Sequence, residues 1–187
     1  MPHSSAPEPV EQPAQPAPAE PPELARLPRG ALQGREAFRQ AVRDALACAA
    51  AHPARFSELL LCDPDFADWP LGERPVVECL QAWALRGQGR LTLLAGRYDE
   101  LQRQAPLFVH WRRQWSHKIE ARACPPAAAA DLPGALCTPA WALRRFNPLH
   151  SICIAGPEAE RRVTLRAELD DWLARSTSAF PATVLGL

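Results

Sequence analysis

Apolar residues recur along this chain at two spacings, one typical of helices and one typical of strands. A helical spacing, with Arg and Asp between the apolar positions, covers residues 35–51 and ends before Pro53. A second helix is predicted to begin at Pro75 and to end at Gly87, because proline suits the first helical turn and glycine the position after the last.

Two more helical stretches follow in the second half of the chain. Residues 99–117 are predicted to be helical with an interruption or restart at Pro106, because proline lacks the backbone N–H that a continuous helix needs. A last helix is predicted to begin at Pro157, with acidic residues near its positive end. Its apolar stripe consists of Leu165, Leu169, Trp172 and Leu173.

Short apolar runs bounded by polar residues predict strands between these helices. They cover residues 57–62, 90–96, 118–124, 135–143 and 150–156, of which 135–143 is expected to run into a turn. Because strands alternate with helices over much of the chain, we expect an α/β fold, a mostly parallel sheet with helices on both faces. The apolar closing segment 176–187 is expected to pack against this domain.

The start of the chain has a different composition. Residues 1–29 are rich in Pro, Ala and Glu, with four Glu and no Lys or Arg before Arg26. Such a segment buries too little apolar surface to offset its ordering entropy. We therefore expect a disordered acidic tail over 1–29 and a single α/β domain over 30–187. Neither a signal peptide nor a membrane span is expected, which favours a cytoplasmic location.

The motif content argues against several kinds of site. The six cysteines form no C-x-x-C pair, so we expect buried free thiols in a reducing compartment and no zinc ligation. No glycine-rich phosphate motif and no G-x-S-x-G elbow occurs. We therefore expect no cofactor and no metal.

Three aspartates are the remaining candidates for binding a metal ion. Asp63, Asp65 and Asp68 follow the first predicted strand, at the edge where open α/β sheets bind ligands. Hard cations such as Mg²⁺ prefer carboxylate oxygens, so a metal site is one interpretation. Turn and helix-entry chemistry, which Asp also supplies, is the favoured one.

Positive charge is concentrated in the middle of the chain, with eight basic and three acidic residues from Arg86 to Arg122. On a helical wheel, Phe108, Trp111 and Trp115 share one face, and the opposite face carries His110, Arg113, Gln114 and His117. A buried aromatic face with a solvated basic face is the favoured interpretation. The alternative is a grip for an anion or nucleic acid, with Arg97, Arg112, Arg113, His117 and Lys118 as candidate binding residues.

Three segments resemble parts of the phospholipase D-like family. ECLQAWALRGQGRLTLLAG (78–96) is similar to its helix–strand unit, and WRRQWSHKIEAR (111–122) to its next helix and short strand. AERRVTLRAELDDWLARS (159–176) is similar to its terminal helix. The resemblance covers 35–187 and implies a phospholipase D-like half domain, similar to uncharacterised bacterial members of the family.

The chemistry of that family depends on an H-x-K-x-x-x-x-D motif, in which His attacks phosphorus, Lys holds the phosphate and Asp orients the His. The chain has one lysine, Lys118, with Ser116 in the place of the His and Ala123 in the place of the Asp. His150 fails as well, because Ile152 occupies the Lys position. The resemblance therefore implies a catalytically inactive domain, and no catalytic residue is assigned.

Three functions remain open. The first is a non-enzymatic intracellular interaction or regulatory module, which contacts an unknown protein partner or self-associates as a dimer. The second is a nonspecific nucleic-acid or anion binder that uses the basic residues. The third is an unrecognised phosphodiesterase with Asp63 or His117 in its site.

Overall fold

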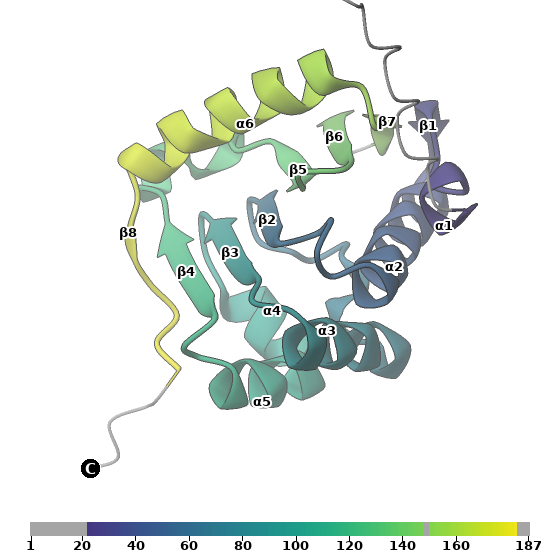
Figure 1. The fold of residues 1–187 in the computed structure, drawn as a ribbon. Coiled ribbons are helices and arrows are strands. Elements are labelled where there is room, and N and C mark those ends of the chain that lie inside the picture. Colours follow the sequence, from purple (N-terminus) through teal and green to yellow (C-terminus); the bar gives the residue numbers. More distant parts are fainter. Residues whose placement is uncertain (1–21, 148–149, 183–187) are drawn as a thin grey trace, which may run out of the picture.

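An eight-stranded mixed sheet organises the computed structural model, which describes residues 22–147 and 150–182 (Figure 1). Its order is β1-β7-β6-β5-β2-β3-β4-β8. The strands are β1 Gly30–Gln33, β2 Glu58–Asp63, β3 Arg90–Ala95, β4 Ile119–Ala123, β5 Gly134–Cys137, β6 Ala142–Asn147, β7 Ile152–Gly156 and β8 Thr177–Ser178. The α-helices are α1 Pro22–Ala25, α2 Arg35–Ala51, α3 Arg74–Arg86, α4 Asp99–Gln104, α5 Pro106–Gln114 and α6 Ala159–Ala174. Short 3₁₀ helices cover Pro70–Gly72 and Pro126–Asp131.

The predicted fold class was a phospholipase D-like half domain with a mostly parallel sheet. The prediction of a mostly parallel sheet is wrong. Among the described strands only β2–β3 and β3–β4 pair in parallel, and the other five pairings are antiparallel. Helices connect β2, β3 and β4 in succession, as parallel pairing requires. From β5 to β7 the strands follow one another without an α-helix, so they form an antiparallel meander, and β1 adds to its outer edge.

The individual elements agree better with the prediction. The structure confirms the four predicted helical regions, with the break before Pro106 separating α4 from α5. The predicted strand 135–143 corresponds to two strands, β5 and β6, joined by a short turn. The short strands β1 and β8 were not predicted. The closing segment packs as expected as far as it is described, because Phe180 is only 8% exposed; residues 183–187 lie outside the described part.

The sheet carries a core on each face, as expected. Leu59 and Leu61 on β2 face the larger core with α2, α3 and α5, while the alternate residues Leu60 and Cys62 face a smaller core. The smaller core is covered by α6, which lies alone across that face (Figure 1). Its predicted stripe is confirmed, with Leu165 and Leu169 buried and Trp172 and Leu173 packed against them. None of the helices in the described ranges is long and apolar enough to cross a membrane.

The folded domain begins earlier than predicted. Leu24 and Leu27 are buried in the larger core, and Trp141 donates its Nε1–H to the carbonyl of Pro28 at 3.0 Å. The boundary predicted at residue 29 is therefore too late, because two leucines in a Pro-rich segment are enough to anchor it. Residues 1–21 of the predicted tail lie outside the described part.

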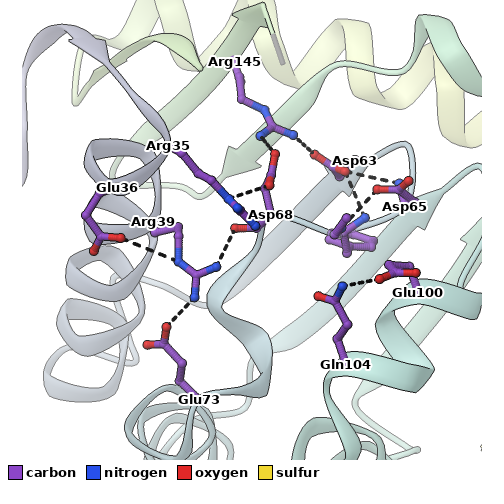
Figure 2. Close-up of polar contacts among 12 residues, drawn as sticks. Arg35, Glu36, Arg39, Asp63, Asp65, Asp68, Glu73, Glu100, Gln104 and Arg145 are labelled. Atoms are coloured by element: carbon purple, nitrogen blue, oxygen red, sulfur yellow. Dashed lines mark hydrogen bonds and ion pairs between the residues drawn. The ribbon is translucent and has the colours of Figure 1, made fainter. Parts of the chain in front are cut away.

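Arg145 on β6 is buried and contacts two aspartates of a polar network (Figure 2). Its guanidinium nitrogens lie 2.6 Å from Asp63 Oδ2 and 3.0 Å from Asp68 Oδ2. The guanidinium also lies 4.5 Å from the centroid of the Phe38 ring on α2. Burial raises the pKa of Asp63, while Arg145 and two backbone N–H groups act in the opposite direction. The network joins β2, β6, α2 and the loop after β2.

A second ion-pair cluster joins α2 to the start of α3. Glu73 directly precedes α3 and accepts hydrogen bonds from Arg43 Nε at 2.8 Å and from Arg39 Nη2 at 2.6 Å. The hydrogen bond from Arg43 is the largest of the causes that lower the pKa of Glu73 from 4.5 to about 2. The Glu73 carboxylate therefore stays ionised and paired over most of the acidic range.

Substitution Arg145→Met should lower the free energy of unfolding by about 3–5 kcal/mol, because it leaves the Asp63 charge buried without its cation. The double variant Arg145→Met with Asp63→Asn should be more stable than Arg145→Met, because Asn keeps the backbone hydrogen bonds but carries no charge. Urea unfolding followed by circular dichroism measures both. Equal losses in the single and double variants would contradict this account.

Substitution Glu73→Gln should weaken the acid dependence of stability. Since the folded pKa of Glu73 is about 2 and the ordinary value is 4.5, its contribution is complete above about pH 5 and is lost as the pH falls towards 2. Glu73 is partly exposed, so we expect a loss of about 1 kcal/mol at neutral pH. The measurement is urea unfolding of both proteins across this pH range.

The control is Glu78→Gln, which changes an exposed glutamate on α3. If both variants follow the parent protein at every pH, Glu73 does not stabilise the fold.

Candidate functional site

A basic cleft of about 380 Å³ lies at the amino-terminal ends of β3 and β4. Its walls come from the first residues of these strands, the end of α5, the turn 116–118 and the closing segment 178–182. The charged side chains in its lining are Arg90, Arg112, Lys118 and Glu120, with His117 beside them. With His117 neutral, three cations face one carboxylate, so the cleft favours an anion.

Arg112 is the unusual residue of this cleft. It is only 5% exposed, and its guanidinium carbon lies 4.2 Å from the centroid of the Phe180 ring. No described residue accepts a hydrogen bond from its guanidinium or forms an ion pair with it, and its Nε is buried without a partner. Burial lowers the pKa of Arg112. Buried polar groups are normally hydrogen-bonded, so an anion in the cleft would supply the missing acceptor.

The closing segment packs against Arg112 through Phe180. Phe180 stacks on Tyr98 with 4.9 Å between the ring centroids. The Tyr98 hydroxyl lies 3.0 Å from the carbonyl oxygen of Leu93 and 2.7 Å from that of Arg122, which fixes the ring against β3 and β4. Tyr98, Phe180 and Arg112 therefore form one stack, whose last member lines the cleft. We call residues 177–182 the strap.

The structure brings together three of the five residues predicted to bind an anion, namely Arg112, His117 and Lys118. Lys118 has a structural partner as well, because its Nζ donates to the carbonyls of Ala84 at 2.7 Å and Gly87 at 2.6 Å, at the end of α3. His117 is exposed, with its ring 5.7 Å from that of Trp115. Lys118 thus contributes charge to the cleft while its hydrogen bonds are used for the fold.

The other two predicted residues lie elsewhere. Arg97 follows the opposite end of β3 and forms an ion pair with Asp65 at 3.1 Å. Arg113 is exposed on α5 and is not part of the cleft lining. The sequence interpretation missed Arg90, which parallel pairing of Leu91 with Ile119 places next to Lys118. The parallel register of the two strands was the signal that could have found it.

The three aspartates at the end of β2 and in the loop after it bond other groups of the chain. Asp63 Oδ1 accepts hydrogen bonds from the backbone N–H of Asp65 at 3.2 Å and of Phe66 at 2.9 Å, which confirms the predicted turn chemistry. Asp63 and Asp68 also pair with Arg145. Within residues 22–147 and 150–182, no group of three or more His, Cys, Asp or Glu side chains is placed to hold a metal ion.

The cysteines are free thiols, and five of the six are buried, as expected, with Cys79 half-buried. Burial raises the pKa of Cys48, Cys137 and Cys153 to about 11. A thiol with a raised pKa is a poor nucleophile at neutral pH, so these residues fit a packing role.

Comparison with known proteins gives information on the fold alone. No family model and no curated protein matches the sequence, so the resemblance to the phospholipase D-like family stays a prediction. Among solved structures, the chain is similar to TrmBL2, described as an archaeal chromatin protein that shows a novel mode of DNA binding, with a TM-score of 0.56 and 10% identity. The match covers 80% of this chain and 53% of that chain, so the present chain spans about half the length of TrmBL2. At this identity the similarity shows a shared fold.

Proposed function

We propose that this protein binds nucleic acid without sequence preference through phosphate contacts in the basic cleft. The observation that carries the proposal is Arg112, a residue only 5% exposed that lines the cleft and whose Nε is buried without a hydrogen-bond partner among the described residues. A guanidinium matches the oxygens of a phosphate in geometry and charge. A bound phosphate would offset the cost of burying Arg112.

Two further observations support a nucleic acid as the source of the phosphate. The lining of the cleft has three cations against one carboxylate, which favours a polyanionic partner. TrmBL2, which shares the fold, is described as binding DNA. The prediction of a nonspecific binder therefore has more support than the other two functions.

The positions of the aromatic residues near the cleft argue against contacts with the bases of a nucleic acid. Trp111 is buried in the larger core, and Trp115 is half-buried, with its Nε1 donating to Gln81 Oε1 at 2.7 Å. Base stacking needs exposed aromatic rings beside the cations. Phosphate contacts without base contacts give binding that is insensitive to sequence.

An interaction module is the second candidate, and one observation favours it. Phe146 is 55% exposed on β6 and Ile152 is 41% exposed on the neighbouring β7. Neighbouring exposed apolar side chains favour a contact site only as part of a larger apolar patch. Self-association as a dimer is the simplest form of this function, and light scattering at micromolar concentration tests it; a monomer would count against it.

Binding of labelled single- and double-stranded DNA and RNA, followed by fluorescence anisotropy, tests the first proposal. The affinity should fall steeply between about 50 and about 200 mM salt, because phosphate contacts release counterions. Substitution Arg90→Gln should weaken binding to all sequences alike and lower the salt slope by about one unit.

The matched control is Arg97→Gln, which removes the same charge at the opposite end of β3. It should leave the affinity and the salt slope nearly unchanged. Equal weakening by both variants would assign binding to the overall charge instead of the cleft, and no binding at low salt would overturn the proposal.

A further inference from the structure

The depth of Arg112 restricts which phosphates can reach it. The side chain is 5% exposed, and the ring of Phe180 covers one face of its guanidinium at 4.2 Å. Phosphates along a duplex lie on the outside of a wide cylinder, each with a sugar on both sides. Such phosphates can contact exposed residues like Arg90. Arg112 is covered by the strap, so only a phosphate that enters the cleft can contact it.

The size of the cleft also favours the end of a strand over an internal phosphate. Its volume of about 380 Å³ is at the lower end of the range for small-molecule pockets. An internal phosphodiester would require the strand to enter on one side of Arg112 and to leave on another. The strap lies on one side, and the turn between α5 and β4 contributes another wall. A strand end needs only one opening.

The charge of the lining fits a terminal phosphate better than an internal one. Arg90, Arg112 and Lys118 against Glu120 leave about two positive charges when His117 is neutral. A phosphate monoester carries a charge of about −1.5 to −2 at pH 7 and has three acceptor oxygens, whereas a diester carries one negative charge. Hydroxyl donors from Thr92, Ser116 and Ser178 also line the cleft and can bond the additional oxygen.

We infer that the cleft binds the terminal phosphate of a nucleic-acid strand, with Arg112 as the residue that contacts it. This inference rests on the proposed function and specifies which phosphate is bound. The exposed cations near the opening then contact the adjoining nucleic-acid backbone. These contacts add affinity that does not depend on whether the strand ends in a phosphate or a hydroxyl.

Anisotropy with three otherwise identical single strands tests the inference: one with a 5′-phosphate, one with a 3′-phosphate and one with hydroxyls at both ends. Each carries its label at an internal position. One of the phosphorylated strands should bind about tenfold more tightly than the hydroxyl strand, as expected for additional charge-assisted hydrogen bonds. Inorganic phosphate should compete away this increment, because it occupies the same cleft, and should leave in place the binding that comes from the adjoining backbone.

Substitution Arg112→Gln should remove the preference for the phosphorylated strand, so that it lowers the affinity for that strand about tenfold more than the affinity for the hydroxyl strand. Arg113→Gln is the matched control, because Arg113 is the next residue on α5, is exposed, and is not part of the lining; it should keep the preference. Urea unfolding establishes that each variant is folded. If Arg112→Gln does not fold, Arg112→Lys replaces it and should reduce the preference, since Lys lacks the planar fork.

The outcomes separate the two proposals. Equal binding of all three strands, or a preference that persists without Arg112, overturns the terminal-phosphate inference and leaves the proposed function standing. No binding of any strand at low salt overturns both.

Discussion

The ion pair between Arg145 and Asp63 is the constraint on which the arrangement of the sheet depends. Asp63 ends β2 and Arg145 lies on β6, with β5 between them in the strand order. The two side chains meet across Gly134 of β5, where a Cβ would lie 2.8 Å from Arg145 Nε and 3.3 Å from Asp63 Oδ2. The pair thus spans the junction between the parallel and the antiparallel strands. It fixes the register there only because position 134 has no side chain.

Arg145 and Arg112 are two buried arginines that differ in their partners. Each lies over a phenylalanine ring, at 4.5 Å from Phe38 and 4.2 Å from Phe180 respectively. Arg145 has two carboxylates as partners, whereas Arg112 has none among the described residues. Burying a charge without a partner is costly. This difference is the basis of the proposed phosphate contact of Arg112.

The sequence predicts the elements of this fold more reliably than their connections. Apolar periodicity identifies the helices and the buried runs of β2 and β3, because each pattern reflects local burial. It carries no information on strand direction, so the antiparallel half was assigned wrongly. The helical wheel separated the aromatic face of α5 from the face that carries Arg113, but it could not show that Phe180, far along the chain, packs over Arg112. The ion pairs of Asp63 and Asp68 with Arg145 likewise join residues far apart in sequence.

The strap connects the edge of the sheet to the cleft. β8 pairs with Arg122 and Ala123 of β4, and Arg122 in turn bonds the Ser176 hydroxyl at 3.0 Å and the Ser176 carbonyl at 2.6 Å. These contacts cover part of an edge strand that would otherwise expose unpaired backbone groups. They also deliver Phe180, which has the unusual positive φ of 47°, onto Tyr98 and Arg112. A strained backbone persists only where its surroundings over-determine it. The strap therefore has two effects: it covers part of the sheet edge, and it places Phe180 over Arg112.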